Sequence, residues 1–502
     1  MPERGLPGVL ASPGSWGYLV PEVRFMILGA LIQDGYRLGL YATVCREWQR
    51  AIEKKIFSRL KLTSSRLADF GNMIHRNRAL VRYVWLCIEL REYPCLPCTE
   101  DESEREATLN RRIVDKAIWD TFKVLSKWEP TGSLLLDISI YSPSDSQHWA
   151  RELQLGSDAL PESDNEQGTA SIGDWHHSYK LYGEACFGAR YGFWKQMPKV
   201  TAVTGLLLRR QNRRQMSVLG VEGLCDRLPR LEIVSYEPWG RLAQQQQWHI
   251  HQDTARMFRS LQVPNQLRRI VLFEDPNDVY ISVFEGHPVP GVYAGATHET
   301  SPALAEASLS LENLSASYIA DALYFFQARK STWVWENLAS LVLTSTLLLP
   351  KGALKSGVNG TQELLLAAAA AAMKMPRLNS MELWRCWVGY AGVFRYQASD
   401  TSNSAKVTWR GNWDLSLQPR VTQAWEAVSL QRGTRSFGVS KELLDLDVPI
   451  VSQADAIQNL QFLQQVVHPV SLWQMKRELP YLERTPPYSL LPEAFAKLKR
   501  SI

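Results

Sequence analysis

Residues 228–236 read LPRLEIVSY, in which an apolar residue and a proline precede the spacing L-x-x-L-x-L. A proline here is typical of the turn after a helix, and apolar residues at every second position are typical of a strand. Similar segments are MPKVTAV from Met197, VPNQLRRIVLF from Val263 and MPRLNSMEL from Met375, with weaker copies at LAEASLSL from Leu304 and LASLVL from Leu338. The recurrence predicts a series of strands, each introduced by a turn.

The spacing of these segments indicates a repeated unit. Their first apolar positions are 200, 231, 267, 304, 338 and 378, so the intervals are 31, 36, 37, 34 and 40 residues. Helical patterns lie between them, such as SVLGVEGLCDRL and TQELLLAAAAAAMK. The units are longer and less regular than ordinary leucine-rich repeats of about 20–29 residues. We therefore expect an α/β fold, with an irregular leucine-rich-repeat-like solenoid at 175–450 that has a parallel sheet inside and helices outside. A non-repetitive α/β domain is the alternative.

The segment before the repeats has a different, wholly helical pattern. Residues 18–35 read YLVPEVRFMILGALIQDG, and residues 36–60 read YRLGLYATVCREWQRAIEKKIFSRL. Pro21 suits the first turn of a helix, and Asp34-Gly35 suits its end. A short second helix around Leu38 and a third one beginning near Trp48 complete three helices in about 40 residues. So small a module buries little apolar surface, so we expect it to depend on a partner or on the next domain.

This segment resembles the F-box. The matching residues are Val20-Pro21-Glu22-Val23, then Ile27-Leu28, then Val44-Cys45-Arg46-Glu47-Trp48, and Val20 replaces the leucine that usually opens the motif. The resemblance implies docking onto a Skp-type adaptor and, through it, onto a cullin in a ubiquitin ligase complex. It assigns the adaptor-binding surface to Val20, Pro21, Ile27, Leu28, Leu31, Val44 and Trp48. The alternative is that several of these residues, Val44 and Trp48 above all, form the core of the three helices.

The chain as a whole is similar to fungal F-box proteins that carry a long C-terminal domain of unknown function. In these proteins the F-box runs directly into a segment like LADFGNMIHRNRALVRYVWLCIEL, which stands here at residues 67–90. The expected organisation is an F-box at 15–60, a helix and strand segment joining it to the repeats at 61–141, a polar acidic loop at 142–174, the repeat domain at 175–450 and a C-terminal capping segment at 451–502.

Composition narrows the class of protein. A net charge of +5 over 502 residues is weak evidence for a polyanion, so we expect no nucleic-acid partner. The longest apolar run, residues 364–373, is too short to span a bilayer, and we expect no membrane association. The seven cysteines form no regular framework, which favours a reducing compartment, the cytoplasm or the nucleus. The basic pairs Arg209-Arg210 and Arg213-Arg214 suit a nuclear address, but a solvated loop is the simpler interpretation.

Motifs for catalysis and for metal binding are weak. Cys95 and Cys98 have the spacing of a zinc or redox pair, but no second pair accompanies them. The pairs His176-His177 and His249-x-His251 have no metal-site context, and no phosphate-binding or nucleophile motif occurs. We therefore expect no cofactor, no metal, no catalytic residue and no enzyme activity.

The resulting hypothesis is a non-catalytic subunit of the ubiquitin conjugation pathway that recognises an unknown protein substrate. The F-box would tether the adaptor, and the repeats would hold the target by protein–protein contacts. Two alternatives stay open. One is an F-box scaffold that works outside a ligase, and the other is an enzyme domain hidden in the C-terminal part.

Overall fold

A single open sheet of twelve strands organises the molecule, in the order β1 to β12. The computed structural model describes residues 16–35, 38–93, 103–130, 132–147, 191–240 except 213 and 215, 244–261, 266–276, 297–350, 360–445 except 388 and 400, 450 and 452–482. The strands are β1 (Arg59–Thr63), β2 (Tyr83–Glu89), β3 (Leu135–Tyr141), β4 (Gly205–Leu208), β5 (Ile233–Tyr236), β6 (Arg269–Phe273), β7 (Asn313–Asp321), β8 (Ser340–Thr344), β9 (Ser380–Trp387), β10 (Tyr390–Ser399), β11 (Ser404–Gly411) and β12 (Ser436–Leu443). Each strand is therefore hydrogen-bonded to the strand that precedes it in the chain.

Strands β1 to β9 are parallel and share one register. The aligned positions are Arg59, Tyr83, Leu135, Gly205, Ile233, Arg269, Asn313, Ser340 and Ser380. In each later strand the L-x-x-L-x-L pattern begins two residues before this position, as at Leu231, Leu267, Leu338 and Leu378. These leucines are buried, because the turn before the strand directs them into the core under the helices.

Two positions of the predicted series were wrong. Leu304 lies in helix α11 (Thr297–Ala307), and the equivalent strand position is Leu311, just before β7. The segment LAEASLSL fits the helical period as well as the strand spacing, so the sequence pattern could not separate the two. Val200 was placed three residues too early, because the equivalent position, two residues before the start of β4, is Val203. The sheet also begins at β1, well before residue 175.

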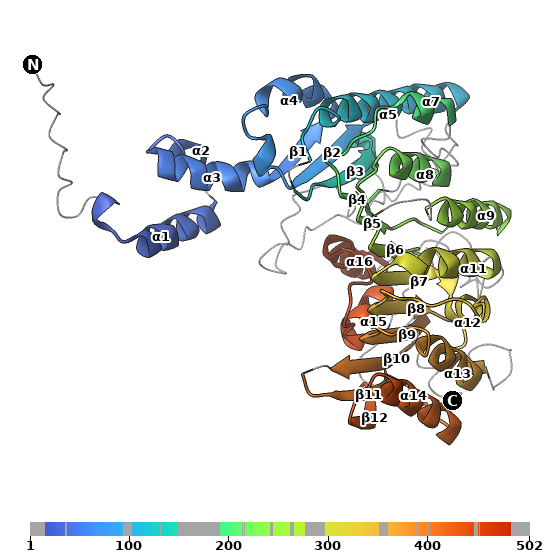
Figure 1. Ribbon diagram of the computed structural model, residues 1–502. Coiled ribbons are helices and arrows are strands. Elements are labelled where there is room, and N and C mark those ends of the chain that lie inside the picture. Colours follow the sequence, from blue (N-terminus) through green and yellow to red (C-terminus); the bar gives the residue numbers. More distant parts are fainter. Residues whose placement is uncertain are drawn as a thin grey trace, which may run out of the picture.

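Helices cover one face of the sheet. They are α4 (Leu67–Met73), α5 (Glu104–Leu125), α7 (Tyr191–Gln196), α8 (Val218–Asp226), α9 (Gln244–Ser260), α11, α12 (Ala322–Gln327), α13 (Gly360–Ala372) and α14 (Pro419–Gln431). In Figure 1 they stack in chain order along the array. The alternating apolar residues of the strands meet these helices in one continuous core, of which Leu86, Leu206 and Leu341 are members.

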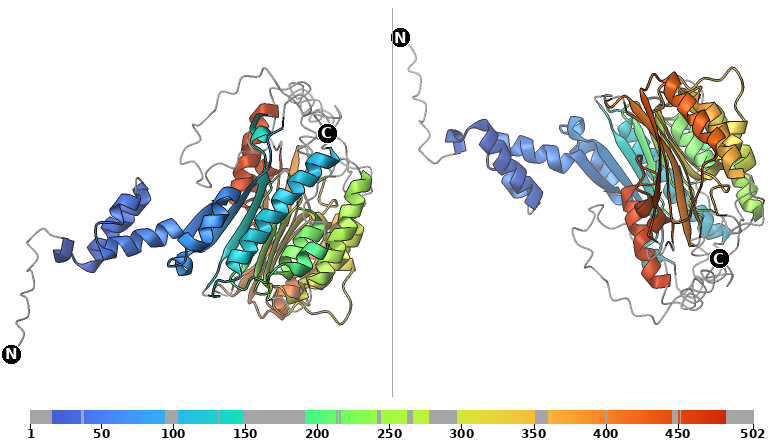
Figure 2. Two further views of the ribbon diagram at one scale, coloured as in Figure 1. Left: turned by 90° about the horizontal axis from the view of Figure 1, so that it is seen from above. Right: turned by 90° about the horizontal axis from the view of Figure 1, so that it is seen from below.

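The C-terminal end departs from the parallel pattern. Strands β9, β10 and β11 are antiparallel neighbours, and β12 then pairs with β11 in parallel. After β12 the chain crosses to the other face, where α15 (Gln453–Leu460) and α16 (Pro469–Leu482) lie, as the two views in Figure 2 show. We call residues 450 and 452–482 the return segment. It forms a second apolar cluster with residues such as Phe273 and Trp384.

Three helices project from the N-terminal end of the array, namely α1 (Pro21–Asp34), α2 (Leu38–Tyr41) and α3 (Arg46–Ser58). A single 3-10 turn at Trp16–Tyr18 precedes them. In Figure 1 they stand apart from the stacked helices. Among the helices in the described parts of the chain, none combines the length and the apolar character needed to cross a bilayer.

Candidate functional site

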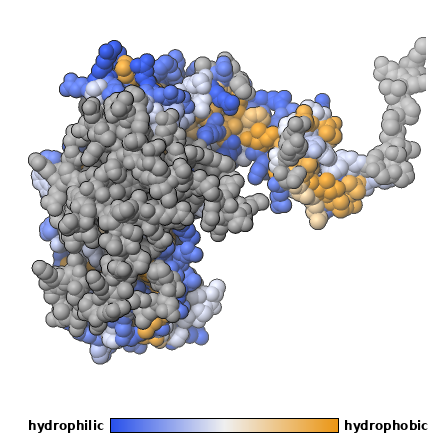
Figure 3. Space-filling view, turned by 180° about the vertical axis from the view of Figure 1, so that it is seen from behind, coloured by the Kyte–Doolittle hydropathy of each residue, from blue (hydrophilic) through white to orange (hydrophobic). Residues whose placement is uncertain are grey.

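The N-terminal helices expose an unusual amount of apolar side chain. Met26 is 73% exposed, Phe25 64%, Leu40 63% and Val44 60%. With Tyr18, Leu19, Val20, Val23 and Ile27 they form what we call the apolar surface. Figure 3 shows orange side chains gathered on these helices. Apolar side chains exposed in such number are typical of a site that another protein covers.

The seven residues expected to bind an adaptor fall into three groups. Val20, Pro21, Ile27 and Val44 are exposed on the module. Leu31 and Trp48 are half-buried. Leu28 is 1% exposed, so it belongs to the core of the module. The helical face that carries Val23, Ile27 and Ala30 therefore points outward.

The residues that sequence reasoning missed are Phe25, Met26 and Leu40. Each of them is more exposed than Val44, Val20 or Ile27. The sequence does contain a sign of this exposure, the run of four apolar residues Phe25-Met26-Ile27-Leu28. Four consecutive apolar residues in a helix point in four directions about 100° apart, so one core cannot bury them all. In a small module, some apolar side chains of such a helix therefore remain exposed, where a partner protein can cover them.

Polar contacts around Glu47 hold the module together. Its carboxylate accepts hydrogen bonds from Trp16 Nε1 at 2.8 Å and from Arg24 Nη1 at 2.9 Å. The neighbouring Trp48 ring packs edge-on against Trp16, with ring centroids 5.1 Å apart, and lies 6.2 Å from Tyr41. These contacts tie α1 and α2 to α3, so the apolar surface has a defined shape.

The module is joined to the sheet without a linker. Helix α3 ends at Ser58 and β1 begins at Arg59. The Ser58 carbonyl oxygen accepts a hydrogen bond from Arg82 N at 2.9 Å, and Arg76 Nη2 pairs with Glu53 Oε1 at 2.8 Å. These two contacts flank the junction between α3 and β1.

The sheet face opposite the stacked helices, here called the polar face, carries charged and aromatic side chains at its N-terminal end. The Arg59 guanidinium lies 4.0 Å from the Tyr83 ring centroid, and Lys61 Nζ lies 4.5 Å from the Trp85 ring centroid. Arg209 contacts the same Trp85 ring at 4.7 Å. Arg59 and Lys61 are exposed, so this end of the face is positively charged.

Arg209 and its neighbours correct an expectation from sequence. The basic pairs at 209–214 were expected in a solvated loop, but Arg209, Arg210 and Arg214 are buried, and Arg213 lies outside the described residues. Arg209 Nη2 pairs with Asp137 Oδ2 at 2.5 Å. Arg210 and Arg214 pair with Asp275 and Asp145, respectively. Carboxylates from neighbouring strands neutralise these arginines, which a local sequence pattern does not reveal.

The titratable groups near Arg209 are buried or half-buried, and several are paired with one another. Burial raises the pKa of the Asp137 carboxyl, against the opposing effect of Arg209. Burial also raises the pKa of Cys87 to about 12, so its thiol is protonated at neutral pH and is a poor nucleophile. Tyr83 donates a hydrogen bond to Asp137, and burial raises its pKa as well. Asp137 Oδ2 thus joins Arg209 and Tyr83 in one largely buried group.

A pocket of about 560 Å³ lies at the carboxyl ends of β2 and β3. Its lining includes Glu106 and Arg214, and both side chains have structural partners. Glu106 completes the capping box of α5 with Ser103, and Arg214 pairs with Asp145. Two of the charged groups that line the pocket are therefore already engaged in contacts within the fold.

The possible metal ligands do not converge within the described part of the chain, where no group of three histidine, cysteine or acidic side chains could hold an ion. His249 is exposed, and His251 Nε2 lies 3.2 Å from Glu274 Oε2 in a buried pair. Cys95, Cys98, His176 and His177 lie outside the described residues, as does most of the loop expected at 142–174.

A family of unknown function (DUF6546) matches residues 262–468, from just before β6 to just before α16. No curated protein matches the chain. The C-terminal part is thus similar to a family whose function is itself unknown, which agrees with the expected C-terminal domain of unknown function. The match includes neither the N-terminal helices nor strands β1 to β5.

Proposed function

We propose that this chain is the substrate-recruiting subunit of a Skp-cullin-F-box ubiquitin ligase. The observation that carries the proposal is the apolar surface of the N-terminal helices, on a segment with the VCREW sequence of the F-box. Exposed apolar side chains next to a rigid proline and tryptophan suit a groove on an adaptor. The three helices would be the F-box, with Val20, Ile27 and Val44 at the contact.

The sheet supports the part of the proposal that concerns recognition of a target protein. Strands β1 to β9 follow one another in chain order and in one register, with helices on one side. We interpret this array as an irregular leucine-rich-repeat-like solenoid, a form that offers long surfaces for protein recognition. Its link to α3 without a linker would hold a bound target at a fixed place relative to the ligase. The chain would then act by positioning the target and raising its effective concentration.

The return segment limits where the target would bind. It covers the polar face from β4 to β11, through contacts such as Gln474 Nε2 to Gln211 Oε1 at 3.2 Å and Arg410 Nε to the Asn459 carbonyl oxygen at 2.9 Å. The N-terminal end, with Arg59 and Lys61 exposed, is outside this span. We propose that target recognition involves this end, because it lies nearest to the F-box.

Adaptor capture by charge variants of the apolar surface tests the proposal. Ile27→Glu combined with Val44→Glu places two carboxylates where the adaptor groove is expected. We expect adaptor co-purification to fall at least about 100-fold, because each buried unpaired charge costs several kcal/mol. The measurement is capture of a purified Skp-type adaptor by the full chain.

Ile233→Glu is a matched control, because Ile233 and Ile27 are both 41% exposed and only Ile27 lies on the apolar surface. It should leave adaptor capture unchanged. Leu28→Ala is unsuitable as the test, since Leu28 is buried and its loss would disturb the module itself. Undiminished capture by the double variant would contradict the proposal. Capture of the adaptor without a cullin would favour a scaffold outside a ligase.

A further inference from the structure

The two ends of the sheet differ in a way that the proposed function does not explain. Strand β1 has five residues, and its exposed side chains are the charged Arg59 and Lys61. Strand β12 has eight residues. Its Val439 is 53% exposed and its Leu443 58% exposed. Natural sheets protect their edges with short strands and charge, so β1 is an ordinary edge and β12 is an exposed one.

The backbone of β12 is open along its outer side. The strand order ends at β12, and none of the described residues pairs with its outer edge. Leu444 N donates to the Gly411 carbonyl oxygen on the β11 side. Because successive residues of a strand direct their backbone groups to alternate sides, Phe437, Val439, Lys441 and Leu443 direct theirs outward. This edge is a ready template for another strand.

Apolar side chains accompany this open backbone. Ser440 Oγ lies 2.8 Å from Thr408 Oγ1, and Arg410, which pairs with Glu442, donates to the return segment on the polar face. The alternate residues, Val439 and Leu443 among them, therefore face the side of α14. Leu430 of α14 is 66% exposed on this helical side. The end of the array thus lacks the polar outer face that terminal repeats normally have.

We infer that β12 pairs with β12 of a second copy of this chain, in antiparallel orientation about a twofold axis perpendicular to the sheet. In the register centred on Ser440, Phe437 faces Leu443 of the partner copy and Val439 faces its Lys441. On the polar face, Gly438 lies opposite Glu442, where the absence of a side chain leaves room for the carboxylate and its arginine. No like charges face each other, and both exposed apolar residues of the strand are covered.

Neighbouring registers fit less well. Centring the pair on Lys441 places two lysines directly opposite, which is unfavourable. Centring it on Val439 leaves Leu443 beyond the paired residues. An extended peptide from another protein could use the same backbone edge. The sequence SFGVSKEL favours a second copy because it is self-complementary in a register that pairs seven of its eight residues.

The oligomeric state of the full chain tests this inference. We expect sedimentation velocity to show a concentration-dependent dimer. Val439→Lys places a lysine opposite Lys441 twice in each dimer, and we expect the dissociation constant to rise about tenfold or more. Adding Lys441→Glu to Val439→Lys places opposite charges across the pair, and we expect the dimer to return.

The rescue depends on the register, so a general loss of folding could not produce it. Lys441→Glu alone is a control, because it shows what loss of the exposed ion pair with Asp414 does to the monomer. Circular dichroism of every variant checks that each one is folded. A monomer at all concentrations up to about 100 µM would overturn the inference. So would a dimer that survives Val439→Lys but is lost in Ile27→Glu, because it would form through the apolar surface. Adaptor capture is expected to be the same in all β12 variants.

Discussion

At the scale of single residues, the contact between β5 and the return segment concentrates buried charge. Glu237 accepts hydrogen bonds from His468 N and Ser471 Oγ, both at 2.5 Å, and from Arg210 N at 2.9 Å. Burial raises the pKa of the Glu237 carboxyl despite these donors. His468 Nδ1 in turn lies 3.3 Å from Val470 N, from which it accepts a hydrogen bond only when the ring is neutral. The site therefore favours an uncharged His468.

His468 makes a specific contribution to acid sensitivity. Burial, with the positive charges of Arg209 and Arg59, lowers its pKa to about 4 from the usual 6.5. Between these values the unfolded chain binds a proton that the folded chain does not, so stability falls as the pH falls from 6.5 to 4. We expect a loss of about 2–3 kcal/mol over this range.

Urea unfolding of the wild type and of His468→Asn at several pH values measures this effect. The asparagine keeps an acceptor for Val470 N and does not titrate. Carboxyl groups with raised pKa, such as Glu237, act in the opposite direction, since their protonation at low pH relieves a buried charge. They are common to both proteins, so the difference between the two curves isolates His468. Parallel curves would show that its pKa is ordinary.

At the scale of elements, the sequence predicted what depends on local periodicity. The α/β class, the three N-terminal helices and four of the six predicted strand positions follow from the spacing of residues such as Leu231 and Leu378. Leu304 misled the prediction because an apolar helix end and an apolar strand share one pattern. The burial of Arg209 could not be predicted, because its partner Asp137 lies in the preceding strand, far away in the sequence, and becomes adjacent only in the sheet.

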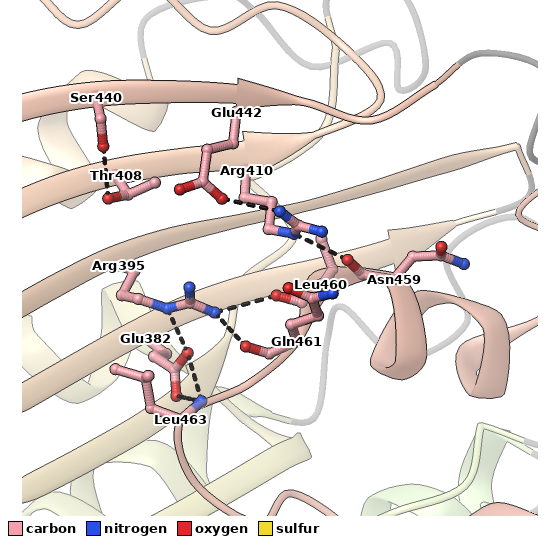
Figure 4. A network of polar contacts seen from close by, with 10 residues as sticks. All are labelled: Glu382, Arg395, Thr408, Arg410, Ser440, Glu442, Asn459, Leu460, Gln461 and Leu463. Atoms are coloured by element: carbon pink, nitrogen blue, oxygen red, sulfur yellow. Dashed lines mark hydrogen bonds and ion pairs between the residues drawn. The ribbon is translucent and has the colours of Figure 1, made fainter.

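The attachment of α15 to the polar face depends on a buried ion pair (Figure 4). Arg395 Nε donates to Glu382 Oε1 at 2.8 Å, and its Nη2 donates to the carbonyl oxygens of Leu460 and Gln461 at the end of α15. Glu382 also accepts from Leu463 N. Arg395→Met would leave Glu382, which is fully buried, without its cation. We expect a loss of about 3–5 kcal/mol in the free energy of unfolding.

Chemical denaturation of Arg395→Met beside Arg410→Met checks this value. Arg410 pairs with Glu442, whose side chain is 42% exposed, and donates one hydrogen bond to the Asn459 carbonyl oxygen. Its loss should therefore cost only about 1–2 kcal/mol. Adding Glu382→Gln to Arg395→Met removes the unpaired charge and should restore part of the stability. Equal losses in the two arginine variants would mean that the Glu382 carboxylate is hydrated after all.

At the scale of the whole molecule, the two terminal segments meet the sheet in different ways. Helices α1 and α2 each contact α3, and α3 alone continues into the sheet. The return segment instead buries Ile457, Leu460 and Val466 against strands from β6 to β10. The first segment is therefore an appendage that exposes apolar side chains, and the second is part of the core. Neither relation follows from sequence, since apolar residues are frequent in both segments.

Two truncations test this difference. Deletion of residues 1–45 removes α1 and α2 and leaves α3 on β1, so we expect the melting temperature of the array to change by less than about 3 °C. Adaptor capture should be lost.

Deletion of residues 450–502 exposes Phe273, Trp384 and Val393, which are fully or nearly fully buried. Each buried side chain of this kind contributes about 1.5–3 kcal/mol, so we expect the melting temperature to fall by at least about 10 °C. Scanning calorimetry measures both. A return segment that could be removed without loss of stability would instead be a detachable cover, and the polar face beneath it would then be open to a target.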